Sequence, residues 1–137
     1  LYGIYTRYKI LYTRYMTSDC LFCKIIKGEI PSFKVYEDDE YLAFLDIRPL
    51  SPGHAVVIPK KHYRWVWDVP EVGAYFETTR KIAVAIQKSF GTDAVVSKII
   101  GEEVPHAHIC LFPEPKEAQG DKNDFAGNAE KIRAQLS

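Results

Sequence analysis

The segment on which the fold and the chemistry depend is Pro105-His106-Ala107-His108-Ile109-Cys110-Leu111-Phe112-Pro113. Its apolar residues predict a strand over residues 106–112, and the side chains of a strand alternate between two faces. His106, His108 and Cys110 then share one face, and the apolar residues between them share the face that a core would cover. Three ligand or nucleophile side chains on one face indicate a metal or catalytic site rather than ordinary packing.

Outward from this segment, apolar runs separated by turn residues predict the rest of the fold. Strands are expected over residues 33–36, 41–46, 54–59, 93–99 and 106–112. Apolar residues at three- and four-residue spacing predict a long helix over 71–90, which Gly91 ends, and a short helix is expected over 126–136. This order predicts an α+β fold, a five-stranded antiparallel sheet with one long helix and a short C-terminal helix.

Size and charge narrow the class of protein. The 137 residues, 47% of them hydrophobic, suit one domain with a single core. The 18 basic and 18 acidic side chains balance, which argues against a protein that coats nucleic acid or an anionic membrane. No apolar run is long enough to cross a bilayer, and none resembles a secretion signal. We therefore expect a cytoplasmic protein with neither nucleic acid nor a membrane as its partner.

Residues 1–15 differ from the rest of the chain. Tyr-Thr-Arg-Tyr occurs twice in them, and the only methionine follows at Met16. One interpretation is a basic aromatic arm that contacts a partner or nucleic acid. The interpretation that we favour is a disordered or cloning-derived extension ahead of a natural start at Met16. Residues 16–137 are then expected to form the single domain.

The cysteines and histidines suggest a metal site. Cys20 and Cys23 have the Cys-x₂-Cys spacing that lets two thiolates bind one tetrahedral zinc ion. Three cysteines cannot all form disulfides with one another, and in a reducing compartment metal-ligand or redox roles are favoured over a structural disulfide. Two histidines would complete a zinc site and leave the others for catalysis. The chain has four: His54, His62, His106 and His108.

Several motifs, in this order, resemble the histidine-triad (HIT) family. The similar segments read CLFCKIIKGEIP (20–31), VYEDD (35–39), AFLDIRP (43–49), PGHAVVIPKKH (52–62) and GEEVPHAH (101–108). Together they extend over about residues 19–115, nearly all of the expected domain. The resemblance is specific because all of these motifs occur together and in order, whereas His-x-His alone would be weak evidence for the family.

The resemblance implies a HIT-like fold and an attack on the α-phosphorus of a nucleotide. The residue that matches the family's nucleophile is His108, which would form a covalent nucleotidyl-histidine intermediate. His54 matches a histidine near the phosphates, and Cys110 stands at the third histidine of the triad. The implied substrates are purine nucleoside phosphoramidates or dinucleoside polyphosphates, hydrolysed or transferred to another acceptor with no metal at the phosphorus.

The resemblance also implies a nucleoside site. Asp46 would accept hydrogen bonds from the ribose hydroxyls, and Glu103 lies at a phosphate-contacting position. The base would contact an apolar wall formed by Phe22, Ile25, Phe44 and Ile47. For Phe44 and Ile47, ordinary core packing is an equally weighted alternative.

Zinc and a second copy of the chain are implied as well. The zinc ligands would be Cys20, Cys23, His62 and His106, and the alternative is an empty site with free thiols. Family members are commonly homodimers, so we expect a dimer that uses the helix over 71–90. Trp65 and Trp67 are candidates for that interface or for the core.

Two departures from the family pattern leave the activity open. A thiol at Cys110 is a weaker donor than imidazole and carries no positive charge, so a nucleotide-binding module with weak or no turnover is the alternative function. Glu102 and Glu103 stand where Gln and a small hydroxyl residue are usual, and a carboxylate that faced the phosphate would repel it. A third possibility, a zinc-stabilised interaction protein without nucleotide binding, is disfavoured because Asp46, His54 and His108 are retained.

Overall fold

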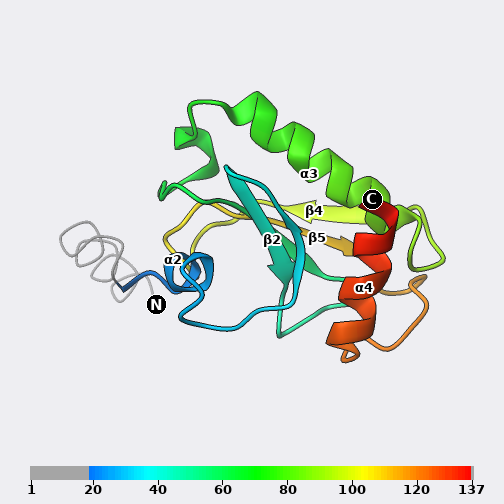
Figure 1. The fold of residues 1–137 in the computed structure, drawn as a ribbon. Coiled ribbons are helices and arrows are strands. Elements are labelled where there is room, and N and C mark those ends of the chain that lie inside the picture. The colour runs from blue at the N-terminus through cyan, green and yellow to red at the C-terminus, as the bar shows by residue number, and fades with distance from the viewer. Residues whose placement is uncertain (1–18, 137) are drawn as a thin grey trace.

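Five antiparallel strands form one sheet in the order β1-β2-β3-β5-β4 (Figure 1). The computed structural model describes residues 19–136, so the extension predicted for residues 1–15 lies outside the described residues. The five-stranded antiparallel sheet predicted from the sequence is confirmed. The strands are β1 (Lys34–Glu37), β2 (Tyr41–Leu45), β3 (Ala55–Pro59), β4 (Val95–Lys98) and β5 (Ile109–Pro113).

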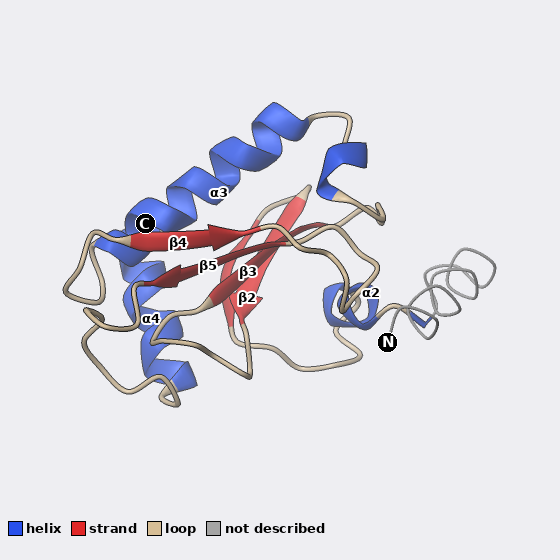
Figure 2. Cartoon of the chain, turned by 180° about the vertical axis from the view of Figure 1, so that it is seen from behind, coloured by secondary structure: helices blue, strands red, loops and turns tan. Residues whose placement is uncertain are grey.

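The sheet is covered on both faces. Helices α3 (Val72–Gln87) and α4 (Phe125–Leu136) pack on one face, and the short helix α2 (Leu21–Ile26) packs on the other, away from α3 and α4 (Figure 2). Every residue of β2 and β3 is therefore buried, which explains why these strands read as continuous apolar runs rather than as alternating ones. The buried side chains form two clusters, one on each face of the sheet.

Helix α3 follows the apolar spacing predicted for 71–90 but ends at Gln87. The Tyr75 hydroxyl donates a hydrogen bond to the Val57 carbonyl at 2.6 Å and so attaches the helix to β3. Phe76 is one of the residues at the three- and four-residue apolar spacing, but it is 39% exposed, so the apolar stripe is narrower than the sequence suggests. Gly91, with a φ of 77°, turns the chain a few residues beyond the helix end.

The predicted strand over 106–112 begins only at Ile109. The backbone of the preceding residues has other partners: the His106 N–H donates to Val104 O at 2.8 Å, and the Ala107 N–H donates to Tyr63 O at 2.7 Å. The alternation of faces nevertheless holds. Ala107, Ile109 and Leu111 lie in the cluster beneath α3, as the pattern predicts.

Helix α2 was not anticipated by the sequence patterns. Cys20 caps it, because the Sγ atom accepts a hydrogen bond from the Cys23 N–H at 3.4 Å. Phe22, Cys23 and Ile25 are buried, and they pack against β2 and β3. The Cys-x₂-Cys pair is thus held at the first turn of a helix.

The turn that leads into β3 places His54 at the end of the sheet. Gly53 has a φ of 80°, which side-chain-bearing residues rarely adopt, and a Cβ there would overlap the Phe90 ring. The Ser51 hydroxyl donates to Pro113 O at 2.6 Å and ties the turn to β5. Glycine at position 53 is therefore required by the backbone and by the packing.

The segment after β3 contains both tryptophans. A short 3₁₀ helix, η2 (Val66–Asp68), leaves Trp67 70% exposed, so a core role for this residue is wrong. Trp65 is half-buried, and the Arg64 guanidinium lies 3.7 Å from its ring centroid. Among the described residues, no helix has the length and apolarity needed to span a membrane.

Candidate active site and metal centre

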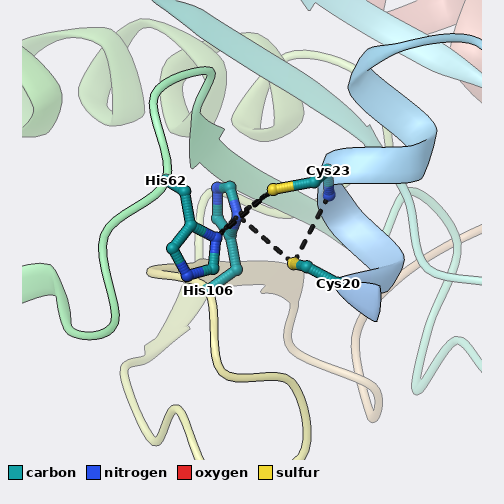
Figure 3. Close-up of side chains that lie close together, drawn as sticks. All are labelled: Cys20, Cys23, His62 and His106. Atoms are coloured by element: carbon teal, nitrogen blue, oxygen red, sulfur yellow. Dashed lines mark hydrogen bonds between the residues drawn. The ribbon is translucent and has the colours of Figure 1, made fainter. Parts of the chain in front are cut away.

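Cys20, Cys23, His62 and His106 converge from three separate segments (Figure 3). The sulfur atoms come from the first turn of α2, His62 follows β3, and His106 precedes β5. The Nδ1 atom of His106 lies 3.5 Å from each sulfur and 3.1 Å from the Nδ1 atom of His62, which lies 3.3 Å from the Cys23 sulfur. All four ligand atoms lie within 4.8 Å of one another.

These distances suit a tetrahedral zinc site. Two sulfur and two nitrogen ligands at ordinary zinc bond lengths define a tetrahedron with edges of about 3.3–3.8 Å. The Nε2 atom of His106 lies 2.8 Å from Pro59 O, so it donates its proton there and leaves the Nδ1 lone pair for a metal. The four residues therefore fit the ion in donor type and number, and His106 also fits it in its tautomer.

Two side chains of the cluster, Cys20 and His62, are in their metal-binding forms near neutral pH. Hydrogen bonding to the Cys23 thiol lowers the pKa of Cys20 to about 4 against the effect of burial, whereas the pKa of Cys23 is raised. Burial, and then the charge of His106, lowers the pKa of His62 to about 4. A thiolate and a neutral imidazole are metal-binding forms.

His108 lies two residues beyond this cluster and is held by the backbone. Its Nδ1 atom lies 2.7 Å from the carbonyl oxygen of His106, and because a carbonyl only accepts, Nδ1 carries the proton. The Nε2 atom is then left with its lone pair. Burial is the main cause that lowers the pKa of His108, so the ring is neutral near pH 7. A buried neutral imidazole with a free Nε2 atom is a competent nucleophile.

His54 has the opposite tautomer. Its Nδ1 atom accepts a hydrogen bond from the Leu50 N–H at 3.1 Å, so a neutral ring carries its proton on Nε2. That atom is buried without a hydrogen-bond partner among residues 19–136, and Asp46 Oδ2 lies 3.7 Å from it. Burial lowers the pKa of His54, although the Asp46 charge opposes this. His54 thus offers an unused N–H donor.

Cys110 is half-buried beside these two histidines. Burial, followed by the charges of Asp46 and Glu103, raises the pKa of its thiol to about 11. Near neutral pH the thiol is therefore protonated and uncharged. It offers a weak donor where a cationic imidazole would be a strong one.

A cavity of about 270 Å³ brings together the three residues predicted to be catalytic. His54, His108 and Cys110 all line it. Its charged residues are three carboxylates and two cations, namely Asp46, Glu102, Glu103, Arg48 and Lys98.

A second cavity, of about 330 Å³, lies next to the first and shares part of its wall. All six residues predicted to bind the substrate line it: Phe22, Ile25, Phe44, Asp46, Ile47 and Glu103. Phe44 also belongs to the core cluster beneath α2, so both interpretations of this residue apply. Ile47 is 73% exposed, so a core role for it is wrong.

The two cavities are joined by residues that line both. Asp46, Arg48 and Glu103 have this position. The Arg48 N–H donates to Asp46 Oδ1 at 2.9 Å, which orients the carboxylate between the cavities. The Phe22 ring lies edge-on to the rings of Phe44 and His108, at centroid distances of 5.4 and 5.2 Å. An apolar pocket therefore opens beside one with several charged residues, which His108 lines.

Sequence patterns did not point to Arg48 or Lys98, although both line the cavity of His108. Arg48 lies in a turn and Lys98 at the end of a strand, and both are exposed. Exposed lysines and arginines are common on protein surfaces, so the sequence alone does not single these two out. Their position becomes evident only from the register of β4 against β5 and from the turn after β2.

Comparison with known proteins agrees with this arrangement. Residues 27–117 match the family described as the HIT domain. An adenosine 5′-monophosphoramidase of Saccharomyces cerevisiae is 41% identical over 106 residues, which make up 74% of this chain and 66% of the yeast enzyme.

Solved structures are similar over most of the chain. A Hit-like protein of Bartonella henselae involved in cell-cycle regulation has a TM-score of 0.75 and 36% identity, covering 88% of this chain and 98% of its own. A Zn-bound histidine triad family protein of Mycobacterium smegmatis has a TM-score of 0.69 and 29% identity, covering 86% and 93%. With the ordered motifs, the sheet and the paired cavities, these matches establish that the chain belongs to the histidine-triad (HIT) family.

Proposed function

We propose that this chain is a nucleotide hydrolase or nucleotidyl transferase that acts through His108. The observation that carries the proposal is the hydrogen bond from His108 Nδ1 to the His106 carbonyl, which leaves Nε2 unprotonated at a polar cavity. The relation to a monophosphoramidase supports the same class of reaction. The proposed substrates are purine nucleoside phosphoramidates or dinucleoside polyphosphates.

The reaction proceeds in two displacements. The Nε2 lone pair of His108 forms a bond to the α-phosphorus while the bond from phosphorus to the leaving nitrogen or oxygen breaks. The leaving group departs with that electron pair and takes up a proton. Water then attacks the same phosphorus, the phosphorus–Nε2 bond breaks, and a proton from the water is released. His108 returns to its neutral state, and a nucleoside monophosphate leaves.

The neighbouring residues bind and orient the nucleotide. The apolar cavity beside Phe22 and Phe44 receives the base, and the Asp46 carboxylate, between the cavities, accepts hydrogen bonds from the ribose. This order directs the phosphate toward the cavity that His54 and His108 line. The free Nε2–H of His54 is a donor for a phosphate oxygen there.

The zinc proposed for the Cys₂His₂ cluster has a structural role. It would be held by Cys20, Cys23, His62 and His106, and it would fix the segment that carries His108 without taking part at the phosphorus. A zinc-bound relative supports this assignment.

A nucleotide-binding module with weak or no turnover is the second candidate. It is favoured by the uncharged thiol of Cys110, which lines the cavity together with the exposed carboxylates of Glu102 and Glu103. Without a third imidazole, charge that develops on the phosphate is stabilised less.

Turnover of a fluorogenic adenosine phosphoramidate separates the two candidates. The hydrolase proposal expects turnover by the parent protein and a loss of at least about a thousandfold in His108→Ala. It also expects a protein adduct one nucleotidyl group heavier by mass spectrometry during turnover, absent from the variant. Absence of activity from both the parent and Cys110→His would favour the binding module.

We also propose a homodimer and a cytoplasmic location. Strand β4 is an edge of the sheet. The exposed ring of Phe76 lies on α3, and that of Trp67 lies on η2, which contacts α3. This side of the molecule therefore offers an apolar surface to a second copy. All three cysteines are free, which suits a reducing compartment. Light scattering at micromolar concentration should give twice the chain mass, and a monomer would refute the dimer. Cell fractionation should recover the protein in the cytosol.

A further inference from the structure

The cavity beside His108 holds a cation that the proposed reaction does not use. Lys98 is the last residue of β4, and the antiparallel register pairs it with Cys110 on β5. Side chains of directly paired residues lie on the same face of a sheet. Lys98 lines the cavity together with His54, His108 and Cys110. It therefore faces the position at which the chain departs from a histidine triad.

The Lys98 ammonium lies close to the polar groups of this cavity. Its Nζ atom lies 5.5 Å from the centroid of the Phe112 ring, and the same ring lies 4.9 Å from the His54 ring. Burial is the largest effect on both neighbouring groups, and it lowers the pKa of His54 and raises that of Cys110. The charge of Lys98 is a smaller effect that acts to lower both pKa values. The positive charge of Lys98 therefore acts on both His54 and Cys110 across the cavity.

No carboxylate of the described residues pairs with this ammonium. Within residues 19–136, Lys98 forms no ion pair, whereas Lys34 and Lys60 both pair with Glu37. The thiol of Cys110 and the buried imidazole of His54 are neutral near pH 7, so they bring no positive charge to a phosphate. The remaining cations of the cavity are Lys98 and Arg48, and Arg48 also faces the second cavity.

We propose that the Lys98 ammonium binds the non-bridging oxygens of the nucleotide's phosphate and supplies the charge that Cys110 lacks. The inference rests on the proposed nucleotide-binding function and assigns a further residue to the same site. A lysine suits this role because its ammonium is a compact charge on a flexible stem that reaches a phosphate from the end of a strand. A lysine that only prevents pairing of an edge strand would leave phosphate binding unchanged.

Calorimetric titration of AMP and of adenosine into the same proteins isolates the contribution of the phosphate. We expect Lys98→Met to weaken AMP binding by about tenfold and to leave adenosine binding unchanged. Lys98→Arg should retain most of the AMP affinity. Lys122→Met, which removes an exposed lysine outside both cavities, is the matched control and should bind both ligands as the parent does.

A second pair of variants tests the link with Cys110. In the Cys110→His background a new imidazole is paired with Lys98 and can itself bind the phosphate. Lys98→Met should therefore reduce the affinity for AMP less in that background than in the parent. AMP affinity of Lys98→Met within about twofold of the parent, or an equal loss for adenosine, would overturn the proposal. If the parent binds neither ligand, the proposed function itself fails and the role of Lys98 fails with it.

Discussion

The Nδ1 atom of His108 lies 2.7 Å from the carbonyl oxygen of His106, while the Nδ1 atom of His106 faces two sulfur atoms at 3.5 Å. His106 therefore contributes to both candidate sites, through its ring to the proposed metal centre and through its backbone carbonyl to the proposed active site. The position of the proposed nucleophile depends on the segment that the zinc would fix.

Zinc binding should depend on Cys20 and Cys23 but not on Cys110. We expect one zinc ion per chain by elemental analysis, and its loss in Cys20→Ser, because this thiol lies in the four-ligand cluster. A chelator should lower the Tm by roughly 10 °C, since the bound ion stabilises only the folded state. Cys110→Ser is the control and should retain the zinc, because Cys110 lies outside the cluster. Zinc retained by Cys20→Ser would contradict the assignment.

Asp46 should contribute to nucleotide affinity through the ribose. Asp46→Asn removes the charge but keeps an oxygen for the Arg48 N–H, which donates to Oδ1 at 2.9 Å in the parent. We expect AMP binding to weaken by about tenfold, as for the loss of a charge-assisted hydrogen bond. An AMP analogue without ribose hydroxyls should bind the parent and the variant equally. An equal loss for AMP and the analogue would show that Asp46 acts elsewhere.

His54 should make the protein less stable in mild acid. Burial lowers its pKa in the folded state below the unfolded value of about 6.5, so the unfolded state binds more protons as the pH falls. Its stabilising contribution is present above about pH 6.5 and is lost as the pH falls toward the folded pKa. Asp46 opposes the shift, and Lys98 adds to it.

Thermal unfolding from about pH 7.5 to about pH 5.5 tests this expectation. His54→Gln should lose less Tm over that range than the parent, because glutamine does not titrate. All other titratable groups are common to the two proteins, so the difference between the two slopes belongs to His54. Parallel slopes would contradict the prediction.

Gly53→Ala should be strongly destabilising. The φ of 80° strains any residue with a Cβ, and here the Cβ would also overlap the Phe90 ring, so we expect a loss of about 2–4 kcal/mol in chemical denaturation. Gly28 is a matched control. It has a φ of 78°, and nothing lies within 4 Å of the position that a Cβ would take, so Gly28→Ala should cost only about 1–2 kcal/mol. Equal losses would show that Phe90 adjusts without cost.

The sequence was a good guide where periodicity or spacing has one structural solution. The strands around β2 and β3 and the long helix were predicted close to the residues where they lie, because burial imposes the apolar pattern. The grouping of Cys20 and Cys23 with His62 and His106 was expected from the resemblance to the HIT family, since spacing alone indicated the two cysteines and left the histidines open. The start of β5 was wrong by several residues, because tertiary hydrogen bonds such as Ala107 N–H to Tyr63 O occupy that backbone.

Other features depend on contacts that no local pattern encodes. Helix α2 is only six residues long, and it is stabilised by packing on β2 and β3 rather than by its own propensity. Lys98 reads as an ordinary surface lysine until the register pairs it with Cys110. The tautomers of His54 and His108 likewise follow from single backbone groups, Leu50 N–H and His106 C=O.

The two clusters of buried side chains lie on opposite faces of the sheet, so a substitution on one face need not disturb the packing on the other. In β5, Ile109 and Leu111 belong to the cluster beneath α3, while Cys110 between them faces the cavity. An exchange of histidine and cysteine at position 110 therefore alters the reactive surface and leaves the packing beneath α3 intact. Over evolutionary time the chemistry at position 110 can therefore vary without repacking the α3 side of the sheet, because Cys110 contacts only the cluster on the α2 side and the cavity.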